Sequence, residues 1–127
     1  MRYICNIIIN ASLEKVTTLF LEHMVVNKNK VPGSTTTFTY NFGNNQEMKM
    51  KETIESIDMP HEIITIYEVE GVWNRCINQF RQEGKQVIFT MDTEFIFYNE
   101  MNVNEEKFRN KTQRQMEEFK KLVEEKL

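Results

Sequence analysis

Glu52 is the carboxylate whose setting in the sequence best suits acid or base chemistry. It alternates with Met48, Met50 and Ile54, and this period of two predicts that all four side chains lie on one apolar side of a strand. Loss of water there would favour the protonated carboxyl that a general acid needs. A bulge or an open end of the sheet would instead leave Glu52 in water, and both alternatives stay open.

Asn74, Cys76 and Asn78 follow one another at the same spacing of two, on one face of a later predicted strand. The two amides could supply hydrogen bonds to an oxygen of a bound molecule, or could bond to each other or to buried water. A thiol nucleophile needs a base beside it, and no histidine is predicted near Cys76. We therefore expect Cys76 to be a small buried side chain.

The two histidines, His23 and His61, lie far apart in the sequence and neither belongs to an HExxH pattern, so we expect solvated positions and no metal site. The two cysteines, Cys5 and Cys76, lack CxxC spacing, which argues against a zinc knuckle or a disulfide scaffold. The four glycines fall at turns or strand breaks rather than in a loop that could hold phosphate. We therefore expect no cofactor.

The composition favours one domain spanning residues 1–127, because 40% of the residues are hydrophobic and 28% are charged. The 16 basic and 19 acidic residues give a net charge of -3, without the basic excess typical of binding to nucleic acid or anionic lipid. The apolar run at 7–9 is too short for membrane insertion, and the N-terminus has no signal-peptide pattern. We expect a cytoplasmic protein with free thiols.

Residues 3–9 are rich in β-branched side chains and predict a strand, after which Ser12 is placed to cap a helix. Alternation with a period of two then predicts five strands, at 35–42, 48–55, 63–70, 72–81 and 86–98. Predicted turns at 43–45 and 58–61 separate the first three of them. No connection is long enough for a crossover helix, so the strands are expected to be antiparallel.

A helical period replaces this alternation from 104 to 127. The apolar face of the predicted helix comprises Phe108, Thr112, Met116, Phe119, Val123 and Leu127. Asn102, followed by the acidic Glu105 and Glu106, is the predicted N-cap. The opposite face is charged, which predicts a solvated surface or, alternatively, a surface that docks a partner.

The apolar face of the sheet needs a cover, and the long last helix is the main element available. We therefore expect an α+β fold in which a curved antiparallel sheet wraps around the C-terminal helix. A curved sheet leaves gaps where side chains do not meet, and such gaps bind small apolar molecules, although the same side chains could instead fill a dry core. The candidate ligand-binding residues are Phe38, Tyr40, Met48, Met50, Tyr67, Asn74, Cys76, Asn78, Phe89, Met91, Thr93, Phe95, Met116 and Phe119.

Three segments, at 9–16, 56–63 and 81–93, resemble respectively the strand-to-helix opening, a turn into the middle strands and the last hairpin of one superfamily. This is the START-like, SRPBCC or polyketide cyclase superfamily, whose helix-grip fold is shared with the birch pollen allergen. The resemblance implies a hydrophobic cavity that binds lipids, sterols or polyketides, and in some members cyclisation or dehydration. Trp73 lies in a middle strand, not after the first helices as is common in the superfamily, and the segment 24–33 is short, so the mouth of the pocket is expected to differ.

Binding of a small hydrophobic molecule without chemistry is the function that these patterns favour. An alternative is a cyclase or dehydratase that uses Glu52 as acid or base, with Asn74 and Asn78 orienting a carbonyl. A further alternative, implied by the chaperone-activating branch of the superfamily, is a module that docks a protein on its outer sheet or helix face.

Overall fold

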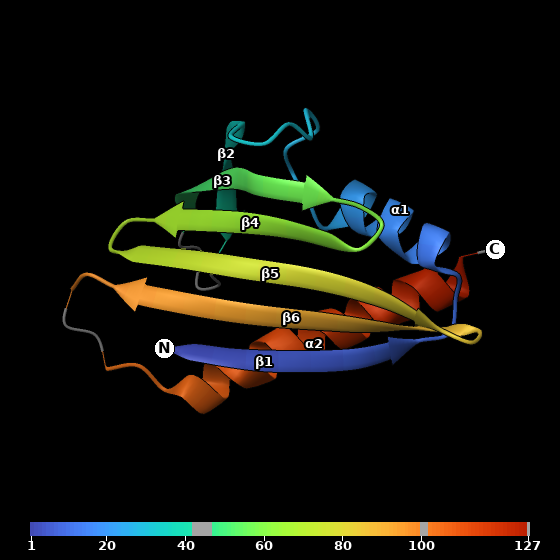
Figure 1. The fold of residues 1–127 in the computed structure, drawn as a ribbon. Coiled ribbons are helices and arrows are strands. Elements are labelled where there is room, and N and C mark those ends of the chain that lie inside the picture. Colours follow the sequence, from blue (N-terminus) through green and yellow to red (C-terminus); the bar gives the residue numbers. More distant parts are fainter. Residues whose placement is uncertain (42–46, 100–101, 127) are drawn as a thin grey trace.

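The computed structural model describes residues 1–41, 47–99 and 102–126, and Figure 1 shows its elements. Their order is β1 (Arg2–Ile9), α1 (Leu13–His23), β2 (Thr35–Asn41), β3 (Glu47–Asp58), β4 (Glu62–Val69), β5 (Val72–Glu83), β6 (Gln86–Phe97) and α2 (Glu105–Glu125). The predicted order of strand, helix, five strands and helix is therefore confirmed, and so is the α+β class. The predicted turn at 43–45, the end of the second strand at Phe42 and the last helical position, Leu127, lie outside the described residues.

The six strands form one antiparallel sheet in the order β1-β6-β5-β4-β3-β2. The first strand of the chain pairs with the last, with Tyr3 opposite Thr93 and Ile9 opposite Val87, while β2 to β6 follow one another as neighbours. A β-bulge between Ile54 and Ser56 interrupts the register of β3 with β4. In Figure 1, β2 crosses behind β3 at a steep angle, so the sheet is strongly curved at that edge.

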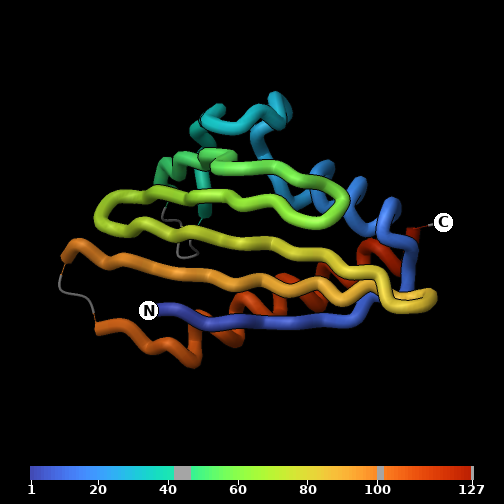
Figure 2. The backbone as a smooth tube through the Cα atoms, in the orientation of Figure 1, coloured from blue at the N-terminus to red at the C-terminus, as the bar shows by residue number. Residues whose placement is uncertain are grey.

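The long helix α2 lies against β1 on the inner side of this sheet (Figure 2). Side chains of α2 bond to the backbone of β1: Gln113 Nε2 donates to the carbonyl of Asn6 at 3.2 Å, and Lys120 Nζ donates to that of Ile8 at 2.7 Å. Because β1 is an edge strand, these bonds occupy carbonyl groups that would otherwise be open to another chain. The helix therefore both covers the inner face and protects one edge.

Each helix begins at a residue whose side chain accepts a hydrogen bond from the first turn. The Ser12 hydroxyl accepts from the N–H of Lys15 at 3.2 Å, as predicted, and the Asn104 side chain accepts from the N–H of Lys107 at 3.3 Å. The predicted cap at Asn102 is wrong, because α2 starts at Glu105 and a cap must directly precede the first helical residue. The Asn102 side chain is therefore outside the helix.

The end of the inner face that lies beneath α1 is filled by an aromatic cluster, and we call it the closed end. Phe20 of α1 makes edge-to-face contacts with Phe80, Phe89 and Phe119, at ring-centroid distances of 5.0, 5.4 and 5.6 Å. All four rings are buried.

Among the described residues, no helix is long and apolar enough to cross a membrane.

Candidate functional site

Four polar side chains form a row across the middle of the inner face. The strand register places Thr65 opposite Cys76, Cys76 opposite Thr93, and Thr93 opposite Tyr3. All four are buried, Thr65 and Thr93 with 1% of their surface exposed. Groups of this kind are buried at a cost unless they are hydrogen-bonded, so the partners of this polar row decide what the inner face can bind.

The β1 end of the polar row is satisfied by the protein itself. The Tyr3 hydroxyl donates to the carbonyl of Phe108 at 3.1 Å and lies 2.7 Å from the Thr112 hydroxyl, so it joins β1 to α2. Thr93 accepts a hydrogen bond from the Asn74 side chain at 2.7 Å. Neither Tyr3 nor Thr93 therefore requires a ligand.

Cys76 lies in the same network and is not an activated nucleophile. Its thiol donates to the Asn74 side-chain oxygen at 3.3 Å and lies 3.4 Å from the Thr93 hydroxyl. Burial raises the pKa of this thiol to about 11, against a smaller lowering effect of the two hydrogen bonds. At neutral pH, Cys76 is therefore a protonated, buried side chain.

Glu52 lies beside the polar row and is completely buried, with 0% of its surface exposed. Its Oε2 accepts a hydrogen bond from the N–H of Val26 at 3.2 Å, and its Oε1 accepts one from the N–H of Asn27 at 2.7 Å. Both donors belong to the segment that follows α1, so the carboxyl group ties that segment to the sheet. This arrangement assigns Glu52 a structural role that the spacing of the sequence did not reveal.

Tyr67 faces Glu52 across β3 and β4. Burial raises the pKa of the Tyr67 hydroxyl well above its ordinary value, and the nearby Glu52 carboxyl raises it further. The phenol is therefore protonated at neutral pH. Both oxygens of Glu52 already accept main-chain hydrogen bonds. Neither Glu52 nor Tyr67 is therefore placed to act as a general acid or base.

Asn78 is a buried polar side chain whose hydrogen bonding is incomplete among the described atoms. It is 2% exposed, and its Nδ2 donates to the carbonyl of Ile63 at 3.2 Å and, more weakly, to that of Cys76 at 3.5 Å. Because both neighbours are carbonyl groups, which only accept, the amide nitrogen must face them and Oδ1 must face away. Among the described atoms, Oδ1 has no hydrogen-bond partner. An unsatisfied buried acceptor typically costs about 1–3 kcal/mol.

The Thr65 hydroxyl is the second buried polar group without a hydrogen-bond partner among the described atoms. Thr65 lies opposite Cys76, two positions from Asn78 on the same face of β5, so it is a diagonal neighbour of Asn78. The Tyr67 hydroxyl is nearby: burial has the largest effect on its pKa and raises it, whereas hydrogen bonding to Thr65 is among the effects that lower it. Thr65 follows the period of Ile63 and Tyr67, and that spacing could have identified it.

The inner face is less completely buried at the end away from α1. Seven apolar side chains there are only partly buried, and we call them the distal cluster: Phe38, Tyr40, Met48, Met50, Phe95, Phe97 and Phe108. The Phe95 ring stacks on Phe97 at a centroid distance of 5.8 Å and meets the edge of Phe108 at 5.1 Å. Phe97 is a member that the sequence analysis did not single out, although it shares the parity of Phe95.

The predicted ligand-binding residues thus fall into two groups. One group is fully buried in the polar row or around the closed end: Cys76, Asn78, Phe89, Thr93, Met116 and Phe119. The other group keeps accessible surface: Phe38, Tyr40, Met48, Met50, Tyr67, Asn74, Met91 and Phe95. Met91 lies directly opposite Asn78, so accessible surface extends from the distal cluster to the neighbourhood of the unpaired amide oxygen.

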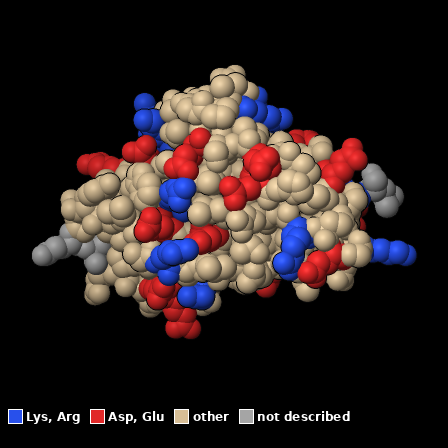
Figure 3. Space-filling view, in the orientation of Figure 1, with Lys and Arg blue, Asp and Glu red and all other residues tan. Residues whose placement is uncertain are grey.

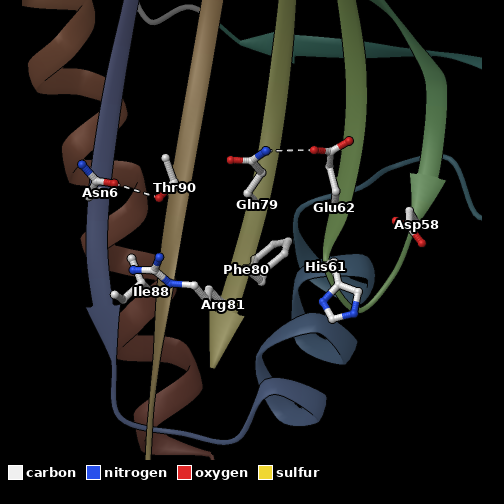
Figure 4. Close-up of a pocket in the computed structure, with 9 residues that line it drawn as sticks. All are labelled: Asn6, Asp58, His61, Glu62, Gln79, Phe80, Arg81, Ile88 and Thr90. Carbon is white, nitrogen blue, oxygen red and sulfur yellow. Dashed lines mark hydrogen bonds between the residues drawn. The ribbon is translucent and has the colours of Figure 1, made fainter. Parts of the chain in front are cut away.

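The outer face of the sheet has a hollow of about 470 Å³ (Figure 4). Two pairs of its polar side chains bond to each other: Thr90 donates to Asn6 at 2.8 Å, and Gln79 donates to Glu62 at 2.9 Å. Figure 3 shows charges of both signs spread over this face. Because the hollow is open and lies on the charged outer face, we do not place the candidate site there.

The remaining candidates for chemistry lie away from the inner face. His23 and His61 are exposed, as predicted. Within residues 1–41, 47–99 and 102–126, no three His, Cys, Asp or Glu side chains come together in a way that could hold a metal ion. Cys5 and Cys76 are both free and buried.

Comparison with solved structures shows the same architecture over the whole chain. Ara h 8.0201 superposes with a TM-score of 0.78, 10% identity and coverage of 99% of each chain. Protein CV1439 from Chromobacterium violaceum gives a TM-score of 0.72 at 12% identity, again over 99% of each chain, and Mll3558 from Rhizobium loti gives 0.66 at 13% identity over 94% and 93%. No protein-family model matches the sequence, and no curated protein does. These similarities confirm the helix-grip fold.

Proposed function

We propose that the protein binds a small, largely apolar molecule between the sheet and α2, without transforming it. The observation that carries this proposal is the distal cluster, whose Met and aromatic side chains point to the inner side of the sheet yet keep accessible surface. Apolar surface removed from water contributes roughly 25 cal/mol per Å². A ligand that covers these side chains would therefore bind favourably, and methionines adapt their shape to different ligands.

Three features of the inner face support binding over catalysis. The Cys76 thiol is protonated at neutral pH, because burial raises its pKa to about 11. Both oxygens of Glu52 already accept main-chain hydrogen bonds. The Asn78 amide nitrogen faces carbonyl groups of the protein, so it is not available to donate to a ligand carbonyl, as the cyclase or dehydratase alternative requires.

The protein-docking alternative would use the outer face or the exposed face of α2. The ion pairs Arg2–Asp92 at 2.6 Å and Arg75–Glu55 at 2.7 Å show that charges on the outer face partner one another. We therefore favour the inner face as the site.

We also propose a single domain in a reducing, cytoplasmic compartment, which the two free buried thiols support.

A fluorescent anilinonaphthalene sulfonate dye, with decanoate as competitor, tests the proposal. We expect saturable binding that decanoate reverses. Met50→Glu places a charge in the distal cluster and should weaken dye binding at least about tenfold, equivalent to about 1.4 kcal/mol. Thr53→Glu adds the same charge on the outer side of β3 and is the matched control. Absence of saturable binding, or an equal loss in both variants, would contradict the proposal.

Mass spectrometry of the intact protein under native conditions provides a second measurement. Protein purified from its own cells should retain a mass that corresponds to a small apolar molecule. Repeated recovery without such a mass, together with no thermal shift from any member of a lipid and polyketide panel, would also contradict ligand binding.

A further inference from the structure

β2 lies at the edge of the sheet opposite β1, and the two edges differ in how they are protected. At the β1 edge, side chains of α2 bond to the carbonyl groups of Asn6 and Ile8. Charged residues, proline or a β-bulge protect the edge strands of many other sheets. The seven residues of β2, TTTFTYN, include no charged residue and no proline, and their register with β3 is unbroken from Thr35 to Asn41. β2 is therefore suited to pair with a further strand.

The main-chain groups of β2 alternate in direction. The N–H of Ile54 in β3 donates to the carbonyl of Ser34, the residue before β2, at 3.1 Å. Bonds between antiparallel strands recur at every second residue, so the even-numbered residues of β2 bond to β3. The odd-numbered threonines therefore turn their N–H and carbonyl groups away from the sheet: Thr35, Thr37 and Thr39. The side chains of these threonines are exposed on the outer side.

The arrangement of these groups fits a second copy of the same strand. We propose that two copies of this chain pair in antiparallel orientation along β2, about a two-fold axis at Phe38, and join their sheets into one. Phe38 is the central residue of β2, so this register overlaps all seven residues. It places Thr37 of each copy opposite Thr39 of the other, and the odd-numbered residues then exchange main-chain hydrogen bonds.

The side chains of β2 favour a second copy over an unrelated peptide. Phe38 is only partly buried in one chain, and in this register it lies opposite Phe38 of the second copy, as an aromatic pair on the inner side. Because β2 carries no charge, self-pairing brings no like charges face to face. A flexible peptide must also lose conformational freedom to become a strand, whereas β2 is already extended in the sheet.

Amide hydrogen exchange, followed by NMR at several protein concentrations, tests this pairing directly. One pair of short strands is a small interface, so we expect a dimer that dissociates at about 10–100 μM. Analytical ultracentrifugation across this range should show the mass rising from 15.3 kDa toward twice that value. Over the same range, the amides of Thr37 and Thr39 should become protected, whereas those of Thr36 and Phe38 should be protected throughout.

Two double variants, substituted at the same positions, test the register. In the variant with Thr37→Glu and Thr39→Glu, like charges lie opposite each other across the axis and should raise the dissociation constant about tenfold. Each new glutamate is also opposite a lysine of β3, Lys51 or Lys49, so the single chain should keep its fold. The variant with Thr37→Glu and Thr39→Lys places opposite charges across the axis and should dimerise at least as tightly as the unmodified protein.

Several results would overturn the inference. One is a protein that stays monomeric at about 1 mM, well above the expected dissociation constant. Another is a dimer that both double variants weaken equally, or that neither weakens, because its interface would then lie elsewhere or have another register. Protection of Thr37 and Thr39 that requires a different protein would assign this edge to that partner instead of a second copy.

Discussion

The ammonium group of Lys111 in α2 lies 5.4 Å from the centre of the Tyr40 ring in β2, a cation–π contact. β2 and β1 are the two edge strands of the sheet, and β1 also packs against α2. Both edge strands of the sheet therefore contact the same helix. Tyr40 belongs to the distal cluster, so the contact lies at the proposed entrance for a ligand.

Lys111→Gln should loosen this entrance without unfolding the protein. A cation–π contact at an exposed site contributes about 0.5–1 kcal/mol, so the loss of unfolding free energy should stay near or below about 1 kcal/mol. Release of the dye, followed by stopped-flow fluorescence, should become faster. Lys121→Gln, an exposed change on the same helix, is the control, and equal release rates in both variants would contradict the assignment.

Met91→Phe should fill accessible space opposite Asn78. Because Met91 is only partly buried, we expect the larger ring to keep or raise the melting temperature and to weaken dye binding. In a closely packed interior, the same change would cost roughly 1–3 kcal/mol. Calorimetry measures the melting temperature and fluorescence titration measures dye binding. A melting temperature lower by several degrees, with unchanged dye binding, would mean that this region is closely packed and holds no ligand.

Thr65→Val should leave the melting temperature of the ligand-free protein unchanged or raise it. The substitution replaces a buried hydroxyl that has no hydrogen-bond partner among the described atoms with a methyl group of similar size. Thr112→Val removes a hydroxyl that bonds to Tyr3 at 2.7 Å and should cost about 1 kcal/mol. Equal losses in the two variants, measured by urea unfolding, would show that the Thr65 hydroxyl is bonded.

Glu52→Gln should destabilise the protein, because an amide offers one acceptor oxygen where the carboxylate offers two. One of the N–H groups of Val26 and Asn27 would then lose its partner, at a cost of about 1–3 kcal/mol. Glu55→Gln removes an exposed partner of Arg75 and should cost less than about 1 kcal/mol. Urea unfolding of both variants measures the difference, and a neutral Glu52→Gln would argue against the structural role.

Stability should fall at alkaline pH, in part because of Cys76. Its pKa is raised by burial from 9.0 to about 11, so its contribution is complete below pH 9 and is lost as the pH rises through 11. Two pKa units correspond to a loss of about 2–3 kcal/mol. In Cys76→Ala, the fall in unfolding free energy between pH 9 and pH 11 should be smaller, and an identical slope in both proteins would contradict the buried thiol.

The element order, and the face to which each inner side chain points, could be predicted from the sequence alone. Period-two alternation and helical spacing are local consequences of backbone geometry, and they identified the strands, both helices and the cap at Ser12. The same parity placed Glu52 inward but left a solvated position open, and the complete burial of its side chain decides for the inward one. The cap of α2 was misplaced at Asn102 because two asparagines lie close together, and only the backbone path selects Asn104.

Three features depended on the tertiary structure, because each joins segments that are distant in sequence. The pairing of β1 with β6 brings Tyr3 to Thr93, and it makes β1 an edge strand covered by α2. The bonds from Val26 and Asn27 to Glu52 turn a candidate acid into a structural group. The unpaired oxygen of Asn78 follows from main-chain carbonyls on two strands, and no spacing of residues specifies where such carbonyls lie.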